Sequence, residues 1–173
     1  LNQGMSGGAV INLKGELVGL TTAAANPTSL DAQAGYAIPL DALGRKIVET
    51  LVAGQEVEYG FLGIGLDLQG TNRVDRCEFG TPAAEGGLLV DDRILAVGEI
   101  AVSNADELVL AVSAQPVGEP VKLKVERNGQ PLTKSVVLAK RRVEGEIIAT
   151  NRPAPWRGLR VDYTTTLAAF DAQ

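Results

Sequence analysis

A serine set among glycines, followed at once by a strand, a tight turn and a second strand, most limits what this chain can fold into. The serine turn is Gly4-Met5-Ser6-Gly7-Gly8. Strands are predicted over Ala9–Leu13 and Glu16–Leu20, because the first limb is rich in β-branched residues and Lys14-Gly15 is a typical turn. Small neighbours let an extended backbone approach Ser6, and the amides of Gly4 and Ser6 are suited to stabilising a developing oxyanion.

The same turn also fits the Gly-x-Ser-x-Gly pattern of α/β-hydrolases, but that pattern leads into a helix and needs a histidine downstream. Here a hairpin follows, and the 173-residue chain has no histidine. Subtilisin-like enzymes also carry a late serine, but a helix follows it. In the chymotrypsin-like order both the histidine and the aspartate precede the serine. With the other two orders disfavoured, the chymotrypsin-like order is the one that fits Ser6, and the base for Ser6 would then lie outside this chain.

Three segments together resemble the HtrA/Deg-type serine proteases. Gly4–Leu20 resembles the catalytic-serine hairpin of that family, Gly35–Leu40 is similar to the Gly-x-Ala-Ile-Pro segment that closes the protease barrel, and Tyr59–Ile64 resembles the start of the following PDZ domain. The segments occur in the family's order. Met5 stands where the family usually has Asn or Asp, but the oxyanion hole uses only the backbone there.

The resemblance implies a mainly β fold with some α. Residues 1–56 would be the C-terminal portion of a chymotrypsin-like β-barrel protease domain, and residues 57–144 a PDZ domain, a small β sandwich with two helices. Residues 145–173 would be a linker or tail. Within the tail, Trp156–Asp162 repeats the pattern of Phe61–Asp67, which indicates either the start of a second PDZ domain or a tail that packs Trp156 on the first.

The resemblance also assigns residues to a protease site. Ser6 would be the nucleophile and the Gly4 amide part of the oxyanion hole. Thr21, Thr22 and Ala23 would pair with the substrate backbone, and Gly35 would line the floor of the specificity pocket. The alternative interpretation is an ordinary hairpin loop whose return strand contains a glycine. A Ser-Lys dyad is disfavoured, because Lys14 lies in a turn and Lys46 on a polar helix face, where neither is desolvated.

A helix is predicted over Pro39–Val52, with Asp41 in its first turn and Gly54 as the stop. Its apolar residues fall on one face at spacings of three and four. They are Leu40, Leu43, Ile47, Val48 and Leu51.

The second half of the chain alternates short strands with two helices. Helices begin after Thr81 and Asn104, the first with proline in its first position. Asn128-Gly129 is a strong hairpin turn. Two turn positions, Asp91 and Gly98-Glu99, depart from the family's pattern. The predicted strands are Phe61–Leu68, Val74–Cys77, Arg93–Val97, Val121–Glu126 and Leu132–Ala139.

By resemblance, this second region binds a peptide as an added strand beside the strand that starts at Ile64. The amides of Leu62, Gly63 and Ile64 would hold the terminal carboxylate, and the last side chain would enter a pocket lined also by Leu108 and Val112. The alternative is that Leu108 and Val112 merely fill the core, which is expected for one of them.

Composition excludes other partners. A net charge of −5 argues against a nucleic-acid surface, and Lys140-Arg141-Arg142 is interpreted as a solvated strand terminus.

The single Cys77 excludes an intrachain disulfide and is expected to be a small buried hydrophobe. We expect no cofactor, no metal and no membrane span. Since the first residue is Leu1, we also expect an excised fragment without its targeting signal.

Two functions follow as hypotheses. In the first, the chain is the C-terminal part of an HtrA-like serine endopeptidase acting in protein quality control or regulated proteolysis. Its partners would be unfolded or extended proteins and C-terminal peptides, its location periplasmic or otherwise extracytoplasmic, and the longer protein a homotrimer. In the second, the chain is a non-catalytic PDZ adaptor derived from such a protease. Without a histidine, the chain alone is predicted to lack triad-dependent proteolysis.

Overall fold

The computed structural model describes residues 4–25, 34–142, 149, 154–155 and 157–159. The chain divides into two compact units, and the division falls between Val57 and Glu58. Most of the predicted tail, including most of the Trp156–Asp162 repeat, lies outside the described residues.

The first unit contains a three-stranded antiparallel sheet in the order β1 (Ala9–Ile11), β2 (Leu17–Ala25) and β3 (Ala34–Pro39). The predicted serine hairpin is therefore confirmed as β1 and β2. Its turn is held by Asn12, whose side-chain oxygen accepts hydrogen bonds from the amides of Lys14 and Glu16. The Asn12 amide also donates to the Glu16 carbonyl, so backbone and side-chain bonds of one residue hold the turn where the chain reverses.

Helix α1 (Ala42–Val52) begins three residues later than the sequence predicts. Pro39 is the last residue of β3, and the Leu40 amide donates to the Val18 carbonyl, which keeps this segment in the sheet. Asp41 is the N-cap, and its carboxylate accepts from the Gly44 amide at 2.9 Å. The predicted start at Pro39 was wrong because strand pairing continues up to the cap.

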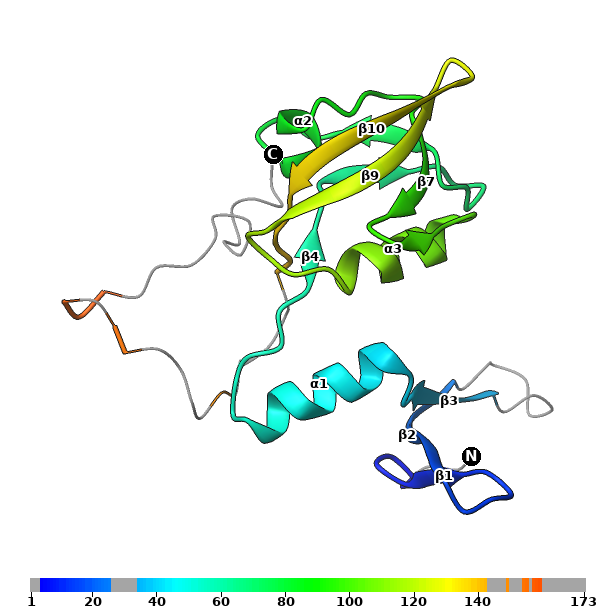
Figure 1. Cartoon of the computed structure of the whole chain (residues 1–173). Coiled ribbons are helices and arrows are strands. Elements are labelled where there is room, and N and C mark those ends of the chain that lie inside the picture. The colour runs from blue at the N-terminus through cyan, green and yellow to red at the C-terminus, as the bar shows by residue number, and fades with distance from the viewer. Residues whose placement is uncertain (1–3, 26–33, 143–148, 150–153, 156, 160–173) are drawn as a thin grey trace. The chain divides into compact units, whose positions relative to one another are not determined.

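The second unit contains a four-stranded sheet in the order β10-β9-β7-β8 and the strand pairs β11-β4 and β5-β6. In Figure 1 the long hairpin of β9 and β10 runs along one side of this unit, and α3 and α2 are separate short helices. The strands are β4 (Gly60–Phe61), β5 (Ile64–Leu66), β6 (Val74–Cys77), β7 (Arg93–Val97), β8 (Ile100–Ala101), β9 (Pro120–Arg127), β10 (Gln130–Val137) and β11 (Ala139–Lys140). The helices are α2 (Pro82–Glu85) and α3 (Ala105–Ser113).

One strand prediction needs correction. The segment Phe61–Leu68 is not continuous, because the chain breaks between β4 and β5 at Gly63, whose φ is +79°. The predicted hairpin turn is confirmed, with both Asn128 and Gly129 in the left-handed conformation that a two-residue turn requires. Asp91, which stands where the family pattern has glycine, also has a positive φ of 74°.

The core of the second unit is one cluster of aliphatic side chains. On β9, Val121, Leu123 and Val125 are buried while the residues between them are exposed, as strict alternation predicts. Helix α3 covers the cluster with Leu108, Ala111 and Val112, and it begins at the predicted cap, where Asn104 accepts from the Glu107 amide.

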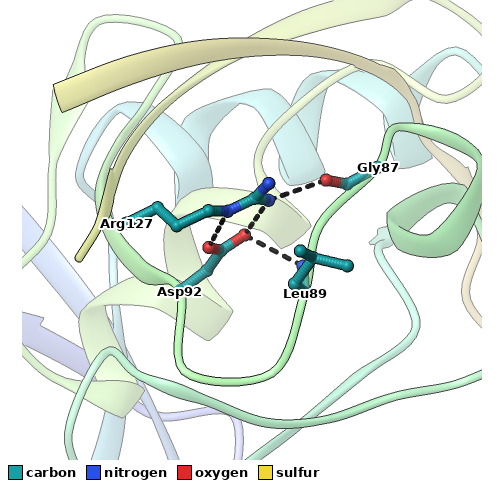
Figure 2. Close-up of polar contacts among 4 residues, drawn as sticks. All are labelled: Gly87, Leu89, Asp92 and Arg127. Carbon is teal, nitrogen blue, oxygen red and sulfur yellow. Dashed lines mark hydrogen bonds and ion pairs between the residues drawn. The ribbon is translucent and has the colours of Figure 1, made fainter. Parts of the chain in front are cut away.

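An ion pair between a buried carboxylate and a partly exposed arginine lies beside this core (Figure 2). Asp92 is completely buried, and its carboxylate accepts two hydrogen bonds from Arg127, at 2.7 and 2.8 Å, and one from the Leu89 amide. Arg127 also donates to the Gly87 carbonyl. Burial alone would raise the pKa of the Asp92 carboxyl, but the bonds from Arg127 and Leu89 outweigh burial and hold the pKa below its ordinary value.

None of the helices in the described ranges is long and apolar enough to span a bilayer. Across those same residues, no cluster of three or more histidine, cysteine or carboxylate side chains is arranged to hold a metal ion. Cys77 is half-buried, and desolvation raises the pKa of its thiol, which disfavours the reactive thiolate.

Candidate functional site: a serine turn and a strand-edge groove

The serine turn is clamped to β2 by Thr21. The Gly7 amide donates to the Thr21 carbonyl at 2.7 Å, and the Thr21 amide donates to the Gly8 carbonyl at 2.9 Å. The Thr21 hydroxyl accepts from the Gly8 amide and donates to the Met5 carbonyl. Because Thr21 is buried, these bonds are shielded from water and fix the backbone on both sides of Ser6.

Ser6 itself is exposed, and its hydroxyl donates to the Thr22 carbonyl at 2.8 Å. Within the described ranges, the amides of Gly4 and Ser6 donate no hydrogen bond to another residue. Unengaged amides beside an exposed hydroxyl meet one requirement of an acyl-transfer nucleophile, which is donors for a developing oxyanion. A base for the hydroxyl proton is absent from the side chains around this turn in the described structure, where a carbonyl accepts it instead.

The four residues predicted to bind substrate lie in or between β2 and β3. Thr21 has its amide, carbonyl and hydroxyl engaged with the serine turn, so it acts as a positioning residue in this structure. Thr22 presents its carbonyl to Ser6 and is skipped in the β2–β3 register. Ala23 pairs with Tyr36, and Gly35 pairs with Ala24. Of the four, Thr22 is the residue whose backbone contacts Ser6.

The second unit contains an apolar groove between β5 and α3, with a cavity of about 190 Å³. The predicted residues Leu62, Gly63, Ile64, Leu108 and Val112 all line it. Leu108 and Val112 also belong to the core cluster, so the interpretation as core residues and the interpretation as groove residues both hold. The other lining residues are Gly60, Phe61, Leu66, Val109, Ser113 and Arg141.

Backbone donors are available at one end of the groove. The carbonyls of Leu62 and Gly63 accept hydrogen bonds from Ala83 and Glu78, but the structure records no acceptor for the amides of Leu62 and Gly63 among the described residues. These amides are therefore available to a carboxylate.

The edge of β5 that faces the groove is also open. Ile64 lies opposite Cys77, next to the bond from the Glu78 amide to the Gly63 carbonyl. Since bonded and non-bonded pairs alternate in an antiparallel ladder, the amide and carbonyl of Ile64 point away from β6, toward the groove.

Thr81 is a positioning residue that the sequence analysis missed. It occupies the predicted N-cap position of α2, but its hydroxyl makes no cap bond. The hydroxyl donates instead to the carbonyls of Glu78 and Gly63, at 2.6 and 3.2 Å. A Cβ on Gly63 would lie 2.2 Å from the Cβ of Thr81, so this loop accepts only glycine. A threonine before a Pro-x-x-Glu helix is a strong signal for a helix cap, so the sequence offered no reason to expect that Thr81 instead holds the loop at Gly63.

The basic run at the end of the second unit also differs from its prediction as a solvated terminus. Lys140 is buried and forms an ion pair with Glu58 at 3.4 Å. The Arg141 amide donates to the Tyr59 carbonyl, and the residue lines the groove. The charge run alone gave no signal for this, since the pairing of β11 with β4 places it there.

A model of the PDZ domain family matches residues 60–138. The groove, the open strand edge and the unengaged amides thus belong to a PDZ domain. The chain as a whole is HtrA-like: it resembles the PDZ-bearing part of HtrA/DegP-type serine endoproteases. The family resemblance and the mainly β fold class predicted from the sequence are confirmed.

Curated relatives support this. The chain is 32% identical to the periplasmic pH-dependent serine endoprotease DegQ of Escherichia coli, over 80% of this chain and 33% of the relative. It is 30% identical to a probable periplasmic DegP-like serine endoprotease of Rickettsia prowazekii, over 76% of this chain and 28% of the relative. The chain thus spans about a third of the length of these relatives.

Solved structures agree. The HtrA-type protease AlgW with a tripeptide is 28% identical, with a TM-score of 0.63, over 83% of this chain and 52% of that one. The serine endoprotease from Yersinia pestis is 32% identical, with a TM-score of 0.56, over 81% of this chain and 49% of that one.

Proposed function

We propose that this chain carries the nucleophile segment and a regulatory peptide-binding PDZ domain of an extracytoplasmic HtrA-type serine endopeptidase. The observation that carries the peptide-binding part is the groove of the second unit, where the amides of Leu62 and Gly63 and the open edge of Ile64 lie beside an apolar pocket. A peptide pairs with Ile64 as an added strand, and its terminal carboxylate binds the amides.

In the proposed protease, Ser6 is the acylating nucleophile and the amides of Gly4 and Ser6 form the oxyanion hole. Thr21 holds the turn, and Thr22, Ala23 and Gly35 lie where a substrate strand and its side chain bind. The histidine and aspartate come from residues outside this chain, which has no histidine. This chain alone is therefore inactive in triad-dependent proteolysis.

The proposal divides the chain into the protease segment 1–56, the PDZ domain 57–144 and a linker or second-domain start over 145–173. The substrates are unfolded or extended proteins, as suits recognition through backbone groups. The location is extracytoplasmic, supported by the periplasmic location in the names of the relatives DegQ and DegP-like. A homotrimer is the proposed assembly of the full-length protein.

The second candidate function is a non-catalytic PDZ adaptor. It is favoured by the bond from the Ser6 hydroxyl to the Thr22 carbonyl, which leaves the hydroxyl without a base in the described structure. Labelling the full-length protein with a fluorophosphonate and mapping the modified peptide distinguishes the two. Labelling at Ser6 that is lost in Ser6→Ala and kept in Ser135→Ala, at an exposed serine of β10, supports the protease. A folded full-length protein that does not react supports the adaptor.

Peptide binding is tested separately by fluorescence anisotropy with this chain. A peptide with a free C-terminal carboxylate should bind, and the same peptide with a C-terminal amide should bind at least tenfold more weakly, since it loses the charge-assisted bonds to the amides. Val109→Glu introduces a charge into the groove and should weaken binding. Leu110→Glu, one residue along α3 and outside the groove lining, is the matched control and should bind as wild type.

A further inference from the structure

The side chain of Arg76 lies over Gly65 of β5, in a position that the peptide-binding proposal does not use. Arg76 is paired with Gly65 in the antiparallel register of β6 and β5. A Cβ placed on Gly65 would lie 3.2 Å from the Cβ of Arg76 and 3.6 and 3.8 Å from its Nε and Cζ. The arginine side chain therefore covers the surface that a side chain at residue 65 would otherwise occupy.

The two faces of β5 differ in character. Ile64 and Leu66 pack against the core and line the groove, so their side chains point to one face. Gly65 lies between them and faces the opposite side, because successive residues of a strand alternate. On that side the side chain present is Arg76, which is 71% exposed.

In a peptide that pairs with the open edge of β5, successive side chains also alternate between the two faces of the sheet. The peptide's last residue lies beside Ile64, with the side chain in the apolar pocket, so its penultimate residue lies beside Gly65 with the side chain on the face of Arg76. The backbone groups of Gly65 point toward β6, which makes this a non-bonded pair, and such pairs bring side chains closest together.

The strand spacing allows an acidic side chain of the peptide to reach the Arg76 guanidinium. Neighbouring strands lie about 4.8 Å apart, so the peptide strand would be roughly 10 Å from β6. The guanidinium already lies over the strand between them because Gly65 has no side chain in its way. A glutamate or aspartate side chain at the penultimate position spans the remaining gap.

We infer that Arg76 selects an acidic penultimate residue in the C-terminal peptides that this groove binds. The inference rests on the proposed peptide binding and adds a specificity determinant to it. Glu78 is the competing partner, since its carboxylate lies 3.2 Å from Arg76 in an exposed ion pair. Solvent-exposed ion pairs are weak, so a peptide carboxylate displaces or shares this contact. Asp75, the other exposed charge of β6, adds a weaker repulsion.

The test uses this chain and three fluorescein-labelled octapeptides that differ at one position, ending in Val-Glu-Val, Val-Gln-Val or Val-Lys-Val. Wild type should bind the glutamate peptide about threefold more tightly than the glutamine peptide at low salt and bind the lysine peptide most weakly, as expected for one exposed charge contact. The glutamate preference should shrink in 0.5 M NaCl.

Three variants assign the preference to Arg76. Arg76→Gln should bind the glutamine peptide as wild type does and lose the glutamate preference. Glu78→Gln should increase the preference, because it removes the competing carboxylate. Arg73→Gln removes an arginine that is paired with Asp91 at 3.0 Å, away from the groove lining, and is the matched control that should keep the wild-type preference.

The outcomes separate this inference from the proposal beneath it. Equal binding of the glutamate and glutamine peptides by wild type, or an unchanged preference in Arg76→Gln, overturns the role of Arg76 and leaves peptide binding intact. If wild type binds none of the three peptides, or binds their C-terminally amidated forms equally well, the peptide-binding proposal itself is wrong and the inference falls with it.

Discussion

The two units of this chain bury their apolar residues to very different extents. Among the described residues of the PDZ unit, fifteen buried aliphatic residues form one cluster. In the serine-turn unit, the buried residues among those described are Gly19, Thr21 and Gly44, while large apolar side chains on its strands and helix are exposed. Both units contain well-formed strands and a helix, so regular secondary structure alone does not show which unit contains its own core.

This difference indicates how each unit is held together. The PDZ unit is stabilised by burial of apolar area, with a buried ion pair at its margin. The serine turn is stabilised mainly by local hydrogen bonds, of which those made by Thr21 are the most shielded. Substitutions in the PDZ unit should therefore change its free energy of unfolding strongly, and substitutions in the serine-turn unit should act locally.

The largest effect is expected for Arg127→Met. The variant leaves the Asp92 carboxylate completely buried without its cation, which costs about 3 to 5 kcal/mol of unfolding free energy for a buried pair broken on one side. Urea denaturation followed by circular dichroism measures it. Arg73→Met breaks the exposed pair with Asp91 and should cost less than about 1 kcal/mol. Equal losses in the two variants would contradict the role of burial.

The pH dependence sharpens this prediction. In wild type the pKa of Asp92 is held below its ordinary value of 3.8. The ionised carboxylate therefore stabilises the native state at any pH above 3.8, and this stabilisation is lost as the pH falls through the lower pKa that Asp92 has in the folded protein. Without Arg127, desolvation raises the pKa, and acidification then stabilises the variant by protonating the carboxyl. The stability difference between the two proteins should narrow between pH 7 and pH 3. A difference that stays constant would mean that Asp92 is not ionised in the native protein.

The next effect compares two leucines, one from each unit. Leu123 is completely buried in β9, and Leu123→Ala should destabilise the PDZ unit by about 3 kcal/mol through lost burial and a residual cavity. Leu51 is 54% exposed in α1, and Leu51→Ala should change stability by less than about 0.5 kcal/mol. Urea denaturation of both variants is the measurement. A large loss in Leu51→Ala would show that α1 is covered in solution and would break the comparison between the units.

Much of this contrast could not be predicted from the sequence. Local patterns predicted the serine hairpin, the Asn128-Gly129 turn and the Asn104 cap, because each depends on residues close in the chain. The apolar face of α1 is as regular as the alternation of β9, yet Leu51 and Val48 are exposed whereas the inward residues of β9 are buried. Periodicity shows which residues share a face but not whether another element covers it.

Polar contacts between residues far apart in the chain also could not be predicted from the sequence. The sequence pattern indicated a turn at Asp91, but the neighbouring Asp92 is bonded to Arg127, 35 residues later. It assigned Thr81 to a cap, but the hydroxyl holds Gly63, 18 residues earlier. The candidate groove was predicted from Leu62 to Ile64 and at Leu108 and Val112, whereas its lining residues Val109 and Arg141 were not. A single sequence contains no signal for side chains that meet only after strands pair.

The smallest effect concerns the serine turn. Thr21→Val keeps the shape of the side chain but removes a hydroxyl that accepts from Gly8 and donates to Met5, which costs about 1 to 2 kcal/mol for a shielded bond. The loss should appear locally, as faster amide hydrogen exchange at Gly7 and Gly8, while exchange in β9 is unchanged. In the full-length protein, fluorophosphonate labelling of Ser6 should slow about tenfold, because the oxyanion amides are less well held.

The matched control for this prediction is Thr22→Val. Thr22 contacts Ser6 through its carbonyl, which valine retains, so labelling and exchange should both stay close to wild type. If Thr21→Val labels as fast as wild type while its exchange at Gly7 and Gly8 rises, the turn is loosened without consequence for Ser6. If exchange at Gly7 and Gly8 also stays at the wild-type rate, the serine-turn unit owes its geometry to contacts other than the Thr21 hydroxyl, and the view that local hydrogen bonds hold this unit is wrong.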